Sequence, residues 1–140
     1  MLIPDRLMLA VCAFGTDLPA ARVAEAIARG VRAGGMDEPD TCLVEDGLPA
    51  ELDARMRRAR AVVVGAERLD RGTPATDRRS AGVVFEIATR ARQAGVPAYA
   101  VTAVNELDAF DARMLDLQVI LEAKGTRGLS AAGRKLARLA

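Results

Sequence analysis

Apolar residues in this chain follow two different spacings that alternate along the sequence. Short continuous apolar runs have the length of strands buried on both faces. Between these runs, apolar residues recur every three or four positions, as on one face of a helix, and glycine or proline separates the segments. The pattern predicts five strands, at residues 7–14, 41–44, 61–65, 98–103 and 117–121.

A polar capping residue, or proline in one case, indicates where each of the five helices begins. Asp17 is the predicted N-cap of the first helix, and Asp108 completes a weak capping box in the fourth. In the last helix we expect Leu136 and Leu139 to face inward. The predicted starts of the other four helices are, in order, Pro49, Ser80, Asn105 and Ser130.

Strands that alternate with helices over short connections predict one α/β domain over residues 1–140. The expected fold is a three-layer, doubly wound, mostly parallel five-stranded sheet of the Rossmann or flavodoxin-like type. The order of the strands does not follow from the pattern. Val62, Val63 and Val64 are all expected to be inaccessible, because a strand covered on both faces has no side that faces water.

The amino-acid composition limits the kinds of core and active site that the chain can form. Only 3% of residues are aromatic, so the core must consist of aliphatic side chains. The absence of histidine excludes imidazole acid–base catalysis, Ser-His-Asp triads and histidine metal sites. Cys12 and Cys42 lie within strand-like runs and are expected to fill the core as free thiols, which favours a reducing, cytoplasmic location.

The charge balance bears on the partners of the protein. Twenty basic and nineteen acidic residues nearly cancel, which favours neither nucleic acid nor an anionic membrane surface as a partner. No apolar run approaches the roughly 20 residues of a membrane-spanning helix, and the first residues lack the order of a secretion signal. A small-molecule ligand and a homo-oligomer both stay open.

Candidate site residues follow from the predicted sheet, because ligands of open parallel sheets bind at the carboxyl ends of the strands. Carboxylates at that edge would suit Mg²⁺ together with a phosphate, although no residue set is assigned as a metal site. Asp46 and Asp70 are the candidate catalytic residues. The candidate ligand-binding residues are Thr16, Asp17, Gly47, Gly65, Glu67 and Arg68.

Each candidate also has an ordinary structural explanation. An aspartate at a helix start, such as Asp17, is more often a cap than a ligand, and Asp46-Gly47 is typical of a turn. The polar stretch 67–79 is long for a strand–helix connection, which favours a functional loop, but its charges are also typical of a solvated one. Neither of the two common glycine-rich phosphate-binding motifs is present.

Several segments taken in order resemble a known family. They are the helix Leu18 to Gly30, the run Cys42 to Gly47, the run Val62 to Asp70, and the helix Gly82 to Gly95 with the following Val96-Pro97. Together they resemble the bacterial two-domain glycerate kinase family, in which a strand followed by G-E-G-R-L-D corresponds to Val64-Gly65-Ala66-Glu67-Arg68-Leu69-Asp70. The resemblance implies a Rossmann-like domain, ATP-dependent phosphorylation of glycerate, and ATP and Mg²⁺ as cofactors.

The chain departs from that family at its motifs. The family's D-S-F-K-G reads Cys12-Ala13-Phe14-Gly15-Thr16, and the second domain inserted after the D-G-G-E-G-T turn is missing. Losing such groups implies a glycerate kinase-like protein with weak or no activity. The alternatives are a non-catalytic α/β binding or regulatory module, dimers included, and a small-molecule enzyme of another type.

Overall fold

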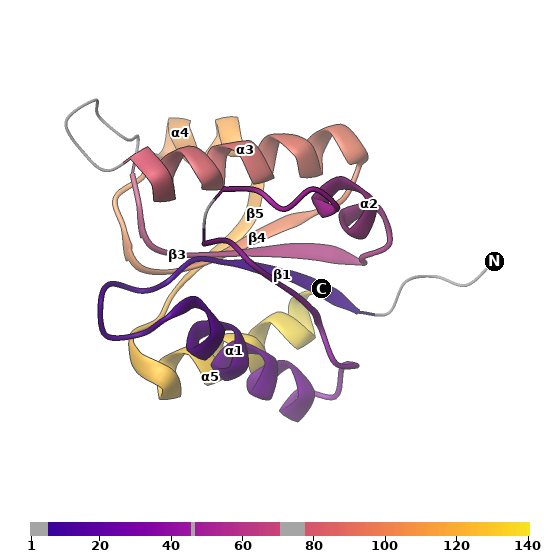
Figure 1. Cartoon of the computed structure of the whole chain (residues 1–140), viewed down its shortest axis with the longest axis vertical. Helices are drawn as coiled ribbons and strands as arrows, with labels where there is room; N and C mark the ends of the chain where they lie inside the picture. The colour runs from indigo at the N-terminus through magenta and orange to yellow at the C-terminus, as the bar shows by residue number, and fades with distance from the viewer. Residues whose placement is uncertain (1–5, 46, 71–77) are drawn as a thin grey trace.

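The computed structural model describes residues 6–45, 47–70 and 78–140, without the side chains of 78–81. Helices cover both faces of a central sheet (Figure 1). The elements in chain order are β1 (Leu7–Val11), α1 (Ala20–Ala33), β2 (Asp40–Leu43), α2 (Leu52–Arg57), β3 (Ala61–Leu69), α3 (Arg78–Ala94), β4 (Ala98–Asn105), α4 (Ala109–Leu115), β5 (Leu117–Glu122) and α5 (Gly125–Leu139).

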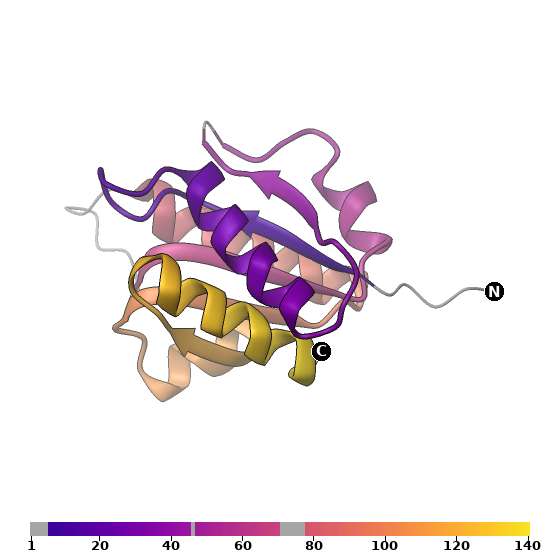
Figure 2. The same ribbon diagram turned by 90° about the horizontal axis from the view of Figure 1, so that it is seen from below.

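The sheet is parallel throughout, and its strands lie in the order β2-β1-β3-β4-β5. Helices α1 and α5 lie on one face, whereas α2, α3 and α4 lie on the other (Figures 1 and 2). This order is that of the flavodoxin-like fold, in which the direction of winding reverses between β1 and β3. The predicted fold class is therefore confirmed.

Two apolar layers hold the helices against the sheet. Val63 faces the layer under α1 and α5, whereas Val62 and Val64 face the layer under α2 and α3. All three side chains have 0% exposure, which confirms the prediction made for this strand. The result follows from the strand's central position, since its alternating side chains meet helices on both sides. The buried Cys12 and Cys42 thiols are free, as predicted.

Helices α1 and α5 pack closely enough for their backbones to touch, and Figure 2 shows them side by side. A Cβ atom on Gly30 would lie 1.8 Å from the carbonyl oxygen of Ser130. One on Gly133 would lie 2.1 Å from the carbonyl oxygen of Ile27. Both positions therefore require glycine, a role that the sequence pattern did not reveal.

Strand boundaries differ from the prediction mainly at β1 and β3. β1 ends at Val11, three residues early, whereas β3 continues past Gly65 to Leu69. Gly65 does not end the strand, because it pairs with Val11 and a Cβ there would lie 2.8 Å from Val11 Cγ1. The buried Thr102 hydroxyl donates to the Glu67 carbonyl at 2.9 Å and supports the extension. Glu67 and Arg68 thus belong to a strand rather than to a loop.

Most of the predicted helix starts are wrong. Helix α1 starts after Pro19 and has no side-chain cap, because Pro19 is its N-cap residue and a proline side chain has no hydrogen-bonding group. The Pro19 carbonyl accepts the first backbone hydrogen bonds of the helix. Asp17 therefore lies in the preceding loop. Helices α2, α3 and α5 begin at Leu52, Arg78 and Gly125, so that Pro49 precedes its helix while Ser80 and Ser130 lie inside theirs.

The fourth and fifth helices need two more corrections. Asp108, not Asn105, is the N-cap of α4, and its carboxylate accepts a hydrogen bond from the Asp111 amide at 2.7 Å. Asn105 instead ends β4. In α5, Leu136 is buried but Leu139 is 45% exposed, because the buried stripe of this helix ends at Leu136. Over the described residues, no helix is long and apolar enough to cross a lipid bilayer.

Candidate functional site

The carboxyl ends of all five strands lie along one edge of the sheet, on the left in Figure 1. From this edge β1 continues into α1 on one face, whereas β3 continues toward α3 on the other. Connections that leave in opposite directions from neighbouring parallel strands open a crevice between them, and this is where ligands of such sheets bind. The edge between β1 and β3 is therefore the candidate site.

The loop from Cys12 to Pro19 forms one side of this site. It is closed by a hydrogen bond from the Phe14 amide to the Leu18 carbonyl, at 2.8 Å, and is tied to β3 by a bond from the Cys12 amide to the Gly65 carbonyl, also at 2.8 Å. The tip of the loop is exposed and includes Thr16 and Asp17. The loop leads directly into the first turn of α1, which has neither a side-chain cap nor an acidic residue.

Glu67 of β3 forms the opposite side and contacts the loop. A Cβ atom on Gly15 would lie 2.9 Å from Glu67 Oε2. Gly15 also has a φ of +69°, which favours glycine on conformational grounds as well. The carboxylate of Glu67 therefore lies against the backbone of the β1–α1 loop, and two segments about fifty residues apart meet at the crevice.

Arg68 connects β3 to the end of β4. Its guanidinium forms an ion pair with Glu106, and the Glu106 amide donates to the Leu69 carbonyl at 2.7 Å. Both side chains of the pair are about half exposed, so the pair contributes little to stability but holds Arg68 at the edge. Glu106 was not among the residues singled out from the sequence.

A second feature of the same edge is an open depression of about 350 Å³ at the ends of β4 and β5. It is lined by Ala103, Val104, Glu122, Ala123 and Lys124. Glu122 also accepts a hydrogen bond from the Asn105 amide at 3.0 Å. The sequence pattern places Ala103 and Val104 near the carboxyl end of a strand but did not indicate the depression, because the rest of its lining comes from the end of β5, and which strand lies beside β4 is known only from the folded sheet.

The predicted site residues occupy different positions relative to this edge. Thr16, Asp17, Glu67 and Arg68 lie on it, and the half-buried Asp70 directly follows β3. Gly47 lies beyond the end of β2 with a φ of +98°. Gly65 is buried inside β3, four residues before its end. Asp46 lies outside the described residues. A role in binding or catalysis stays a prediction for all of them.

The titration behaviour of the cysteines limits the chemistry of this edge. Burial raises the pKa of the Cys12 thiol to about 11 and also raises that of Cys42. Burial therefore favours the protonated form of both thiols at neutral pH, whereas a nucleophilic cysteine requires the thiolate. In the part of the chain that the structure describes, no three cysteine or acidic side chains gather closely enough to hold a metal ion.

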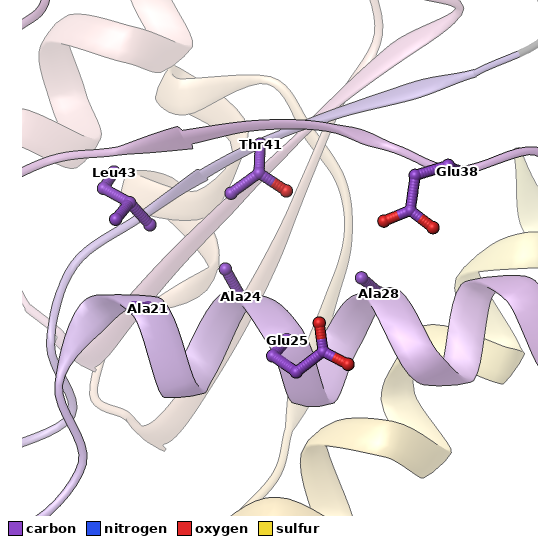
Figure 3. Close-up of a pocket in the computed structure, with 7 residues that line it drawn as sticks. All are labelled: Ala21, Ala24, Glu25, Ala28, Glu38, Thr41 and Leu43. Carbon is purple, nitrogen blue, oxygen red and sulfur yellow. The ribbon is translucent and has the colours of Figure 1, made fainter.

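A smaller groove of about 140 Å³ lies between α1 and the outer strand β2. Ala24, Ala28 and Thr41 line it together with Glu25 and Glu38 (Figure 3). Arg32 donates to the Glu25 carboxylate at 3.2 Å and to that of Glu38 at 2.7 Å. Because both carboxylates already share this guanidinium, the groove is a weaker candidate for a charged ligand.

Comparison with known proteins gives structural neighbours only, since no family model and no curated protein matches the chain. The flavodiiron protein from Giardia intestinalis superposes with a TM-score of 0.57 at 15% identity, over 96% of this chain and 36% of that one. A diflavin flavoprotein from Nostoc sp. superposes with a TM-score of 0.54 at 16% identity, over 96% of this chain and 93% of that one. The sugar isomerase domain of an RpiR transcription factor from Sphaerobacter thermophilus has a TM-score of 0.50 at 17% identity, over 95% of this chain and 67% of that one.

The chain has a flavodoxin-like fold. It spans about a third of the Giardia protein, and at these identities the likeness concerns the fold alone. The resemblance to glycerate kinases is wrong, because the first two of these neighbours are a flavodiiron protein and a diflavin flavoprotein, and neither family models nor curated proteins support the glycerate kinase family. Alanine-rich helices after valine-rich strands recur in many doubly wound domains, which explains the misleading match.

This correction leaves two functional interpretations without support, namely a glycerate kinase and a non-catalytic regulatory module. The neighbours do not support ATP-dependent phosphorylation of glycerate, and they give no support for ATP and Mg²⁺ as cofactors. They do not specifically support a non-catalytic regulatory module either. The function must therefore be argued from the edge of the sheet itself.

Proposed function

We propose that this domain binds a small phosphorylated ligand in the crevice between the carboxyl ends of β1 and β3. The observation that carries the proposal is the reversal of strand order at this point, where the β1–α1 loop and Glu67 meet. Flavin mononucleotide is the first ligand to test, because one structural neighbour is named a flavodiiron protein and another a diflavin flavoprotein.

The start of α1 supports binding of the phosphate group. Amide N–H groups in the first turn of a helix point toward its N-terminal end and carry partial positive charge, which favours an anion at that end. Here the first turn of a 14-residue helix contains Arg22 and no acidic residue, and no side chain caps it. Arg22 is exposed and adds a full positive charge next to these amides.

Glu67 opposes the phosphate but suits the rest of such a ligand. Its carboxylate would repel an anion placed in the loop, whereas it would accept hydrogen bonds from ligand hydroxyl groups. The residues therefore fit a phosphate at α1 and a hydroxylated portion beside Glu67. No aromatic side chain among the described residues lies exposed in the β1–α1 loop or on β3, so we assign no residue to hold a flavin ring.

Titration of the purified protein with flavin mononucleotide, followed by flavin fluorescence and calorimetry, tests this proposal. We expect saturable binding that Arg22→Glu weakens by about tenfold, since it replaces a positive charge beside the phosphate with a negative one. Glu67→Gln should strengthen binding, since it removes a negative charge from the same crevice and keeps a carbonyl oxygen that accepts hydrogen bonds from ligand hydroxyl groups. Arg29→Glu is the matched control, because this exposed residue lies two turns further along α1. Absence of binding, or binding that ignores both site variants, would contradict the proposal.

A further inference from the structure

Helix α4 carries the two most exposed large apolar side chains of the described residues. Phe110 is 61% exposed and Met114, one turn later, is 58% exposed. Asp111 and Leu115 are buried, so the exposed pair forms the outer face of the helix. A contiguous apolar pair of this kind is typical of an interface, where Phe and Met are enriched.

The surroundings of this pair differ in charge at its two ends. Glu106 and Asp108 are exposed before the helix. At the other end lie the exposed Arg113 and also Arg92 of α3, which donates to the Met114 carbonyl at 3.3 Å. Asp116 at the C-cap offsets part of this positive charge, and Arg68 offsets part of the negative charge through Glu106. The face remains acidic at its start and basic toward its end.

We propose that α4 docks antiparallel against α4 of a second copy of this chain around a two-fold axis. In this arrangement Phe110 packs against the partner's Met114, and the acidic start of each helix faces the basic end of the other. A two-fold interface requires a surface that complements itself, which this charge distribution provides. Figure 2 shows α4 at the β5 side of the molecule, away from the β1–β3 crevice.

The short helix limits the strength of the dimer. Helix α4 has seven residues, so the buried area falls below that of a standard interface, about 1,600 Å² in total. We therefore expect weak, reversible self-association, with a dissociation constant between about 10 µM and 1 mM. The inference does not depend on the proposed ligand.

Sedimentation velocity of the full chain at protein concentrations from about 10 µM to 1 mM tests the dimer in the range expected for a small interface. We expect the wild type to shift from monomer to dimer and Phe110→Glu to stay monomeric, with unchanged circular dichroism. Leu139→Glu, which alters another exposed apolar residue, should dimerise like the wild type. A wild type that stays monomeric, or a Phe110→Glu variant that dimerises normally, would overturn the proposal.

Cysteine cross-linking tests the antiparallel geometry. We mix Phe110→Cys with Met114→Cys and add oxidised glutathione, while the buried native thiols, with raised pKa values, react slowly. A mixed disulfide should form faster than a disulfide within either variant alone. Faster linkage of Phe110→Cys with itself would rule out the proposed arrangement.

Discussion

The glycines at the contact between α1 and α5 show how a single residue decides the packing of two helices. Gly133 leaves no room for a methyl group, whereas a Cβ on Gly128 in the same helix would meet its nearest neighbours at 3.6 Å, an ordinary contact distance. Both residues lie in α5, so they have the same intrinsic cost in helix propensity. Only the surroundings differ.

Replacing Gly133 with alanine should therefore destabilise the protein by about 2 kcal/mol or more, because the helices must move apart. The matched change Gly128→Ala should be neutral, or stabilising by up to about 1 kcal/mol, since alanine favours the helix. Urea denaturation followed by circular dichroism measures both. Equal effects of the two substitutions would contradict the packing described for α1 and α5.

A second residue-scale contact couples stability to pH. Arg55 Nε donates to Asp40 Oδ2 at 3.0 Å, and the same guanidinium donates to the Thr41 carbonyl at 2.8 Å. The hydrogen bonds from Arg55 lower the pKa of Asp40 below its ordinary value, although burial opposes this shift. Both side chains are about a quarter exposed, so solvent only partly weakens the pair.

A carboxylate whose pKa is lower in the folded state stabilises the fold above its unfolded pKa, about 4, and loses this contribution as the pH falls through its folded pKa. We expect Arg55→Met to lower the free energy of unfolding by about 1–3 kcal/mol at pH 7. The difference from the wild type should shrink as the pH falls below about 4. Urea unfolding at several pH values measures this difference in stability. A difference independent of pH would show that Arg55 does not stabilise the fold through the carboxylate of Asp40.

At the scale of elements, β3 is the strand whose existence the sequence indicated most clearly. Its predicted length was nevertheless the least accurate, because the strand continues from Gly65 to Leu69. The β-branched run Val62–Val64 indicated a buried strand, and local pattern was sufficient for that. Gly65 suggested that the strand ends there, because glycine often marks the end of a strand. Its actual role depends on Val11 in the neighbouring strand, a contact that no local pattern contains.

The helix starts failed for a similar reason. Asp17 and Ser130 are good capping residues, but α1 starts at Ala20 and α5 at Gly125. The start of a helix depends on where the preceding strand leaves the sheet, in addition to the local preference for a cap. Side chains such as Asp17 are therefore left exposed in the loops of the candidate site.

The central position of β3 leads to a prediction about charge in the core. Val63→Asp should prevent folding, because an unpaired buried carboxylate costs several kcal/mol, roughly the whole stability of such a domain. Leu43→Asp on the outer strand β2, at a position 36% exposed, should fold. Thermal unfolding of both variants decides the matter, and a soluble, cooperatively folded Val63→Asp protein would place β3 at an exposed edge.

For the whole molecule, the fold class followed from the sequence but the strand order did not. A crossover from β1 can place the next strand on either side, and both choices obey the right-handed rule. Without that order, the sequence indicated only that several strand ends carry polar residues. The folded sheet brings Gly15 and Glu67 together, while the family resemblance pointed to the wrong chemistry.

Under the proposed function, a phosphorylated ligand binds between the carboxyl ends of β1 and β3. Backbone amide chemical shifts of the ¹⁵N-labelled protein, recorded during addition of flavin mononucleotide, show whether and where it binds. We predict that the largest shifts occur in the loop 12–19, in the first turn of α1 and at residues 67–69. Saturating shifts confined to the opposite edge of the sheet, or no shifts at millimolar ligand, would contradict it.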